Sequence, residues 1–265
     1  MNKNPIGIFD SGVGGLSVVK EIIKVLPEEN IIYFGDTARV PYGTKSERVI
    51  KKFAVEDVIF LLKYNPKLIV IACHTVSSYA SYYLRKKFKN IKIIDVIEPT
   101  VEKAVKLTKN KKIGVIGTTA TISSLRYQKL FSKYKGIEVY TKDCPLFVPV
   151  VEEGWFENEI SYKIAEIYLS ELKKKNIDTL VLGCTHYPYL KKTIQKIMGK
   201  NVEIIDASYE VSIKIKNIIE ENNLNNKGGK GKISLYFSDI SPHVEKTIKF
   251  LFEKNNIKYK LTKNV

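Results

Sequence analysis

The sequence predicts an α/β protein built from two doubly wound parallel-sheet domains that are related by pseudo-symmetry. Short apolar, β-branched segments alternate with helical patterns along almost all of its 265 residues. A weak internal repeat relates the first half of the pattern to the second. A cysteine follows an equivalent predicted strand in each repeat, which indicates that both halves contribute to one site.

Most predicted strands lack polar alternation, as is typical of strands buried on both faces of a parallel sheet. They cover residues 6–9, 31–34, 68–72, 91–96, 113–116, 137–140, 179–182, 203–206 and 233–237. After the first strand, an apolar stripe of helical period ends at Pro27. The next helix is expected to open with a capping box at residues 44–47 and to stop before Pro66.

The repeat aligns residues 6–11 with 113–118, and residues 69–73 with 180–184. Each cysteine then lies at the carboxyl end of its strand, the edge where open α/β sheets bind ligands. We therefore expect a first domain of residues 1–97 plus 208–265, a second of residues 98–207, and an active site in the cleft between them. The Gly/Asn/Lys-rich loop at 222–231 is expected to be mobile.

The formal net charge of +16 suits nucleic acid, an acidic surface or an anionic small molecule. Lysines are spread along the whole chain, which favours a solvated surface of biased composition. Basic motifs of RNA-recognition or major-groove readers are missing, so nucleic-acid or anionic-metabolite binding is the minor alternative. No apolar run approaches the roughly eighteen residues of a membrane helix, and the three cysteines form no even framework. We expect a cytoplasmic protein with free thiols and no membrane partner.

Cys73 and Cys184 are each followed by hydrogen-bonding side chains, whereas Cys144 lacks such a setting and is assigned a structural role. A thiol with an ordinary pKa of ~8.5 can exchange a proton near neutral pH. Two thiols on opposite faces of one carbon suit racemisation, in which one removes the α-proton and the other returns a proton. Asp10 and His186 could each assist one thiol, and oriented donors could replace a cofactor.

Two other chemistries compete for the same residues. Cys73, His74, Cys184 and His186 match a Cys₂His₂ zinc set by type, but their spacing does not match known zinc modules. We therefore expect no metal. A single-cysteine hydrolase would leave the second cysteine and the repeat unexplained.

Two turn-rich segments follow predicted strands. Residues 10–15 can form a tight turn that binds an anion or simply caps a helix, and their spacing matches no nucleotide-binding motif. Residues 35–43 offer Tyr42 and main-chain amides to a substrate, while Arg39 is either a carboxylate partner or a fold-stabilising residue. Glu152 and Glu153 are expected to be solvated, or to support the site from its periphery.

Six segments occur in an order that resembles the glutamate racemase family: FDSGVGGLSV, YFGDTARVPYG, IACHT, VIGTTAT, LFVPVVEEG and LGCTHYP. The resemblance runs from residue 6 to about residue 208. It implies two α/β domains around a cleft and interconversion of L- and D-glutamate without pyridoxal phosphate or metal. It also implies a homodimer that supplies D-glutamate for peptidoglycan, and hence for cell-wall biogenesis and cell shape. Aspartate racemase and related two-cysteine isomerases are the alternative.

The resemblance carries roles onto individual residues of this sequence. The implied catalytic residues are Cys73, Cys184, Asp10, His186 and Glu152. The implied substrate-binding residues are Asp10, Ser11, Pro41, Tyr42, Gly43, His74, Thr75, Thr118, Thr121, Thr185 and His186. Position 74 departs from the family, which normally has Asn there. His74 can still donate through a ring N–H, and its charge is expected to vary with pH.

Overall fold

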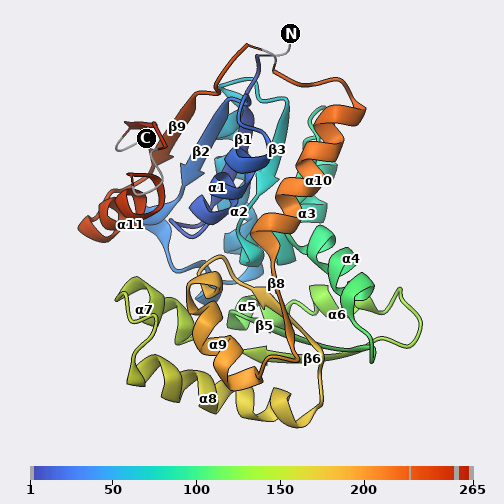
Figure 1. Ribbon diagram of the computed structural model, residues 1–265. Coiled ribbons are helices and arrows are strands. Elements are labelled where there is room, and N and C mark those ends of the chain that lie inside the picture. The colour runs from blue at the N-terminus through green and yellow to red at the C-terminus, as the bar shows by residue number, and fades with distance from the viewer. Residues whose placement is uncertain (1–2, 227, 254–256, 263–265) are drawn as a thin grey trace. The chain divides into compact units, whose positions relative to one another are not determined.

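The computed structural model describes residues 3–226, 228–253 and 257–262 (Figure 1). The chain divides into two compact units, one formed by Met1–Val96 with Ser208–Val265 and the other by Ile97–Ala207. The first boundary lies one residue before the sequence-based one, and the second coincides with it. Each unit is a parallel sheet with helices around it, so the predicted α/β fold class is confirmed.

Unit 1 has a six-stranded sheet in the order β10-β9-β2-β1-β3-β4, with every described pair parallel. Its strands are β1 (Ile6–Asp10), β2 (Ile31–Gly35), β3 (Leu68–Ile71), β4 (Ile93–Asp95), β9 (Ile233–Phe237) and β10 (Lys260–Thr262). Its helices are α1 (Leu16–Val25), α2 (Glu47–Leu62), α3 (His74–Lys87), α10 (Ala207–Glu221) and α11 (Pro242–Phe252). β1, β2 and β3 are buried along their whole length, as their apolar sequences predict.

Unit 2 has a four-stranded parallel sheet in the order β6-β5-β7-β8. Its strands are β5 (Lys112–Gly117), β6 (Glu138–Asp143), β7 (Thr179–Gly183) and β8 (Glu203–Asp206). Its helices are α4 (Ile97–Leu107), α5 (Thr119–Ser123), α6 (Arg126–Phe131), α7 (Phe147–Glu152), α8 (Glu159–Lys174) and α9 (Lys191–Met198). The order matches β2-β1-β3-β4 of unit 1, which is the pseudo-symmetry that the repeat predicts.

The two sheets also share their register. Gly7 lies opposite Ile69 in unit 1, and Gly114 lies opposite Leu180 in unit 2. Cys73 and Cys184 each follow that paired position by four residues. The cysteines therefore occupy equivalent places at the carboxyl edges of their own sheets.

In each unit, the helix that follows the last repeated strand belongs to the other unit. α4 follows β4 of unit 1 but packs on β7, β8 and α6 of unit 2. α10 follows β8 of unit 2 and belongs to unit 1, where Ser208 at its start shares a 3.0 Å hydrogen bond with Ser17. The chain thus crosses between units after two equivalent strands.

One local expectation is wrong, and one strand was not predicted. The helix α2 begins at Glu47 with Ser46 as its N-cap, and Thr44 instead lies in a short 3₁₀ turn (Tyr42–Thr44), so the capping box at 44–47 is wrong. Strand β10 was not predicted, because it has only three residues, of which Lys260 is exposed and the other two are partly buried. In the loop at 222–231, the main-chain amide of Asn226 donates to the buried Glu29 carboxylate at 2.8 Å.

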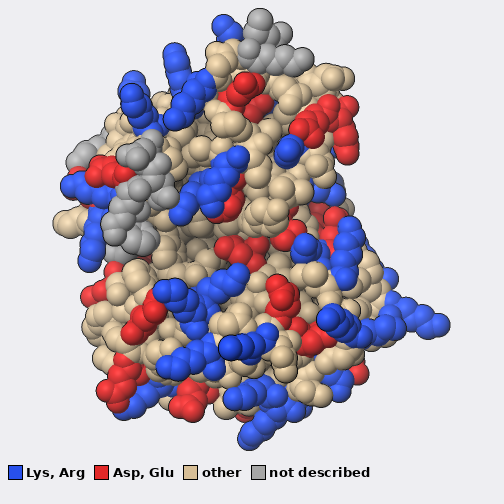
Figure 2. Space-filling model, in the orientation of Figure 1, with Lys and Arg blue, Asp and Glu red and all other residues tan. Residues whose placement is uncertain are grey.

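Surface charge is dispersed. On the face shown in Figure 2, Lys and Arg side chains are spread out with Asp and Glu among them. Within the described residues, no helix is both long and apolar enough to span a bilayer. The face shown in Figure 2 therefore has no continuous basic surface for a polyanion.

Candidate active site

In unit 1 the strand β1 ends at Asp10, which is fully buried. The Gly12 amide donates to its Oδ2 at 2.9 Å, so the turn after the strand fixes the carboxylate. A Cβ on Gly15 would lie 2.6 Å from the Asp10 Cβ and 3.0 Å from that of Ala72. Glycine is therefore required for α1 to begin this close to the ends of β1 and β3.

Cys73 follows β3 and is the N-cap residue of α3, with only 5% of its surface exposed. Its Sγ lies 3.3 Å from the Ser11 hydroxyl, which comes from the turn after the neighbouring strand β1. Thr75, two residues on, is buried in the first turn of α3. The parallel pairing of β1 and β3 thus brings Asp10, Ser11, Cys73 and Thr75 to one edge of the sheet.

His74 is the first residue of α3 and is 3% exposed. Neither ring nitrogen has a hydrogen-bond partner among the residues that the structure describes. Burial lowers the pKa of His74 to about 3. Desolvation therefore keeps the imidazole neutral near pH 7, and the change of its charge with pH falls in the acid range. A neutral imidazole presents one N–H donor and one acceptor nitrogen.

The segment after β2 contributes main chain more than side chain. Tyr42 is 2% exposed, and its hydroxyl donates to the buried carboxylate of Asp36. Pro41 and Gly43 flank it with partly or fully exposed surfaces. The groups that residues 41–43 can offer a ligand are therefore main-chain ones.

In unit 2 Cys184 follows β7 and is 6% exposed. The His186 ring Nδ1 lies 3.8 Å from its sulfur, and the Nε2 of the same ring lies 3.5 Å from Glu152 Oε1. Glu152 is the last residue of α7, so this helix brings a carboxylate to the histidine. Cys184, His186 and Glu152 form a thiol–imidazole–carboxylate series.

His186 is held in its protonated form by that series. Burial alone lowers its pKa, but the interactions with Cys184 and Glu152 outweigh burial and raise the pKa to about 10. A protonated imidazole beside a sulfur is the setting in which cysteines in general act as thiolates. The protonated ring of His186 therefore lies next to the Cys184 sulfur.

The remaining predicted residues of unit 2 cluster after β5 and β7. Thr118 is the N-cap of α5, its Oγ1 accepts from the Thr121 amide at 3.2 Å, and the two hydroxyls lie 2.9 Å apart. Thr185 is buried next to Cys184. Thr118 and Thr121 thus have a capping role in α5, and any role in substrate binding comes in addition to it.

The repeat also shows how the two halves differ. Gly117 occupies in unit 2 the place of Asp10, and Thr75 occupies in unit 1 the place of His186. The carboxylate of one half therefore precedes its cysteine, at the end of the neighbouring strand, while the imidazole of the other half follows its own cysteine. Asp10 ends the strand that pairs with the strand before Cys73, whereas His186 Nδ1 lies 3.8 Å from the Cys184 sulfur.

Cys144 also follows a strand, β6, but at a position of the repeat different from that of Cys73 and Cys184. Its amide donates to the Gly117 carbonyl at 2.9 Å, just as the Asp36 amide donates to that of Asp10, so these positions are equivalent. Cys144 is fully buried, and burial raises its pKa well above the ordinary thiol value. The structural assignment of Cys144 fits this position.

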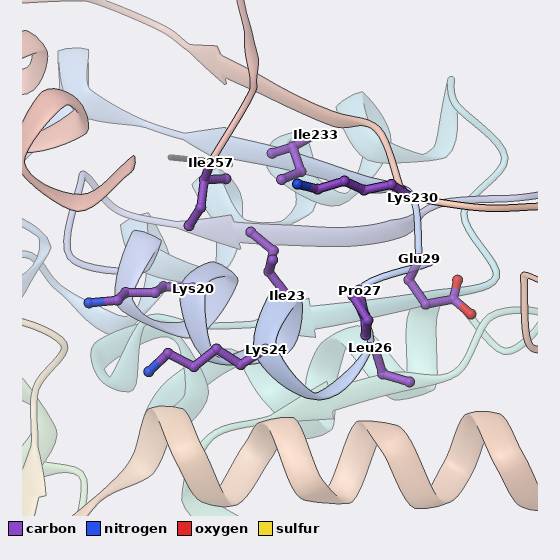
Figure 3. A pocket seen from close by; sticks show the side chains of 10 residues that line it. Lys20, Ile23, Lys24, Leu26, Pro27, Glu29, Lys230, Ile233 and Ile257 are labelled. Atoms are coloured by element: carbon purple, nitrogen blue, oxygen red, sulfur yellow. The ribbon is translucent and has the colours of Figure 1, made fainter. Parts of the chain in front are cut away.

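A pocket of about 330 Å³ lies elsewhere in unit 1 (Figure 3). Lys20, Lys24 and Lys230 surround an apolar lining that includes Ile23, Ile233 and Ile257. It lies at the amino ends of β2 and β9, and none of the predicted site residues lines it. Within the described part of the chain, no three His, Cys, Asp or Glu side chains are grouped to hold a metal ion.

Known proteins similar to this chain in sequence and structure identify its family. A sequence model of the Asp/Glu/Hydantoin racemase family matches residues 6–208. This chain therefore belongs to that racemase family and, by the similarities below, to its glutamate racemase members.

A glutamate racemase of Aquifex pyrophilus is 46% identical over 250 residues, which cover 94% of each chain. The crystal structure of a Francisella tularensis glutamate racemase with D-glutamate has a TM-score of 0.92 at 40% identity, covering 99% of this chain and 98% of that one. A glutamate racemase isoform of Bacillus anthracis has a TM-score of 0.93 at 34% identity over the same shares. The protein is accordingly a racemase.

Replacing Glu152 by Gln is expected to weaken proton transfer at Cys184. The variant loses the carboxylate that raises the pKa of His186, so this pKa should fall by about one unit. The basic limb of the kcat profile should move to lower pH by the same amount. The neighbouring exposed Glu153, replaced by Gln, serves as the matched control and should leave the profile unchanged. An unchanged profile for the Glu152 variant would remove Glu152 from the series.

Proposed function

We propose that this protein interconverts L- and D-glutamate by a two-base mechanism in which Cys73 and Cys184 are the acid and the base. The observation that carries the proposal is the equivalence of the two cysteines. Both follow the same register position of matching strands, and both are nearly buried beside a group that can accept or donate a proton. The D-glutamate complex of the Francisella tularensis relative supports the choice of substrate.

The proton balance of the proposed step is simple. The thiolate of one cysteine takes the α-proton, so an S–H bond forms while the Cα–H bond breaks. The electron pair stays on the substrate, delocalised into its carboxylate. The thiol of the other cysteine then gives its proton to the opposite face of the same carbon, which restores a Cα–H bond with inverted configuration. Before the next turnover in the same direction, the first cysteine must lose the proton it took and the second must regain the one it gave.

The surrounding residues are assigned supporting parts. Asp10 acts on the Cys73 side, while His186 and Glu152 act on the Cys184 side. Ser11, Thr75, Thr185 and the main chain of residues 41–43 would bind the amino acid, with donors that offset the charge developing on its carboxylate. His74 would bind it through its neutral imidazole.

The broader role is inferred from the same assignment. D-Glutamate made by the enzyme would enter peptidoglycan. Three free cysteines fit a reducing compartment, so we infer a cytoplasmic location. We also infer a homodimer, as the family resemblance implies.

Incubation with L-glutamate in D₂O tests the proposal. Optical rotation should fall to zero, and deuterium should appear at the α-carbon of the product, because the returned proton comes from a thiol that exchanges with solvent. Absence of both changes from mildly acidic to basic pH would refute racemisation of glutamate. Parallel incubation with L-aspartate decides the substrate, since faster turnover of aspartate would replace glutamate in the proposal.

A further inference from the structure

A partly buried charged network holds the segment that contains Pro41, Tyr42 and Gly43. We call Asp36, Arg39, Glu56 and Asp57 the Arg39 network. Arg39 donates through Nε to Asp36, through Nη1 to Glu56, and through Nη2 to Asp57 Oδ1 at 3.2 Å. One guanidinium thus joins the segment after β2 to the helix α2.

All three nitrogen atoms of the guanidinium have a carboxylate partner within the protein. Arg39 is therefore not available as a direct partner for a substrate carboxylate. The fold-stabilising alternative considered for Arg39 is the one the structure supports. Sequence alone does not reveal Asp57, because an acidic residue on an amphipathic helix normally faces solvent, whereas this one is 1% exposed.

Tyr42 is fixed by the same network. Its hydroxyl donates to Asp36, and burial raises its pKa far above the ordinary value, so it stays a phenol and a donor. Its ring lies 5.6 Å from that of Phe53, whose face lies 4.0 Å from the guanidinium carbon of Arg39. The side chain of Tyr42 is thereby held at both its ring and its hydroxyl, which fixes the main chain that follows.

The other flank of the segment is held by the residues after β9. Ser238 Oγ donates to Asp36 Oδ1 at 3.0 Å and accepts from the Ala38 amide at 2.9 Å. Thr37 Oγ1 donates to the Asp239 carbonyl. Residues 36–39 are therefore tied to α2 on one side and to the C-terminal part of the sheet on the other.

Such a network is costly to bury. Asp36 and Asp57 are both almost fully buried, and Asp57 Oδ2 has no hydrogen-bond partner among the described residues. Burial and the nearby Asp36 raise the pKa of Asp57, which reflects the cost of holding its charge in this place. Well-packed apolar residues commonly stabilise a fold at least as well as buried ion pairs, so this network indicates a need for fixed geometry.

We propose that Arg39, acting with Asp36, Asp57 and Ser238, is a positioning residue that sets the main chain at Tyr42–Gly43 for binding the substrate carboxylate. The role is distinct from proton transfer by the cysteines, and it rests on the function proposed above. Arg39 itself does not touch the substrate.

The test compares Arg39→Lys and Ser238→Ala with the unchanged protein. Lysine keeps the charge but loses the fork that reaches three carboxylates. We expect amide hydrogen exchange at residues 42–45 to become about 10-fold faster in both variants, and the KM for glutamate to rise about 10-fold. The kcat should stay within about 2-fold, because the cysteines and their neighbours are untouched.

Arg85→Lys is the matched control. Arg85 donates to the buried Asp95 at 3.0 Å, and the exposures of this pair, 32% and 0%, resemble the 29% and 0% of Arg39 and Asp36. The control should lower the melting temperature without changing the KM or the exchange at residues 42–45.

The outcomes separate the two proposals. If Arg39→Lys and Ser238→Ala lower stability but leave KM and exchange at residues 42–45 unchanged, the positioning role is overturned while glutamate turnover by the unchanged protein still stands. If the unchanged protein turns over no glutamate, the catalytic proposal fails, and the exchange rates still decide whether the network positions the segment. Ser238→Ala alone decides it if Arg39→Lys does not fold.

Discussion

Replacing either Cys73 or Cys184 by serine is expected to lower glutamate racemisation by ~10³-fold in both directions. A serine hydroxyl does not exchange a proton with a carbon acid at neutral pH, and the third cysteine, Cys144, follows a different strand, β6, and is fully buried. Circular dichroism of L- and D-glutamate solutions measures the loss. Serine has nearly the same shape as cysteine and differs in the atom that exchanges the proton, so the fold should persist.

Deuterium uptake assigns the two cysteines to opposite faces. With one thiol intact, each variant should still exchange the α-proton of one enantiomer slowly without inverting it. The two variants should act on opposite enantiomers. Proton NMR in D₂O reads this directly, and exchange of the same enantiomer by both would contradict a two-face arrangement.

Cys144→Ala is the control for the third thiol. Cys144 is fully buried at the place that corresponds to Asp36, so its loss should cost about 1 kcal/mol of stability and leave turnover within about 2-fold. A racemase that lost activity here as well would remove the special standing of the other two cysteines.

Acidification is expected to destabilise the protein through His74 by an amount that His74→Asn abolishes. The folded-state pKa of about 3 lies below the unfolded value of 6.5, so the neutral form is favoured in the fold. This stability is fully present above pH 6.5 and is lost as the pH falls toward 3. At pH 4 the extra loss should be about 3 kcal/mol.

Urea unfolding of the unchanged protein and of His74→Asn at pH 7 and pH 4 measures this difference, because other titrating groups cancel. The same neutrality predicts that the KM for glutamate in the unchanged protein shows no histidine titration attributable to position 74 between pH 6 and 8. Equal acid sensitivity in both proteins would show that His74 is already solvated or paired in the fold.

The sheets were predictable because their strands are apolar and buried on both faces, a pattern that few other structures share. The short edge strand β10 was not predictable, since three partly exposed residues are too few to show a strand-like apolar pattern. The start of α2 was misplaced because Thr44 and Ser46 are both good N-cap residues, and only the tertiary structure selects Ser46.

At the site, the strand-end cysteines and their neighbours were predictable from the repeat, because equal register places them alike. The Arg39 network was not, since Asp57 comes from a helix whose burial depends on packing against the segment after β2. The low pKa of His74 was not predictable for a similar reason. Sequence shows the residue type, while only the fold shows how completely water is excluded from it.

The chain leaves unit 1 before α4 and returns to it at α10, so the two units are completed in a fixed order during synthesis on the ribosome. Residues 97–207 are contiguous, so the unit that contains Cys184 has emerged in full while its partner still lacks α10 and β9. The earlier unit begins first and finishes last, because β2 must wait for a strand about 200 residues downstream. Its unpaired β2 edge is exposed for that whole interval, when a nascent chain is most in need of protection from aggregation.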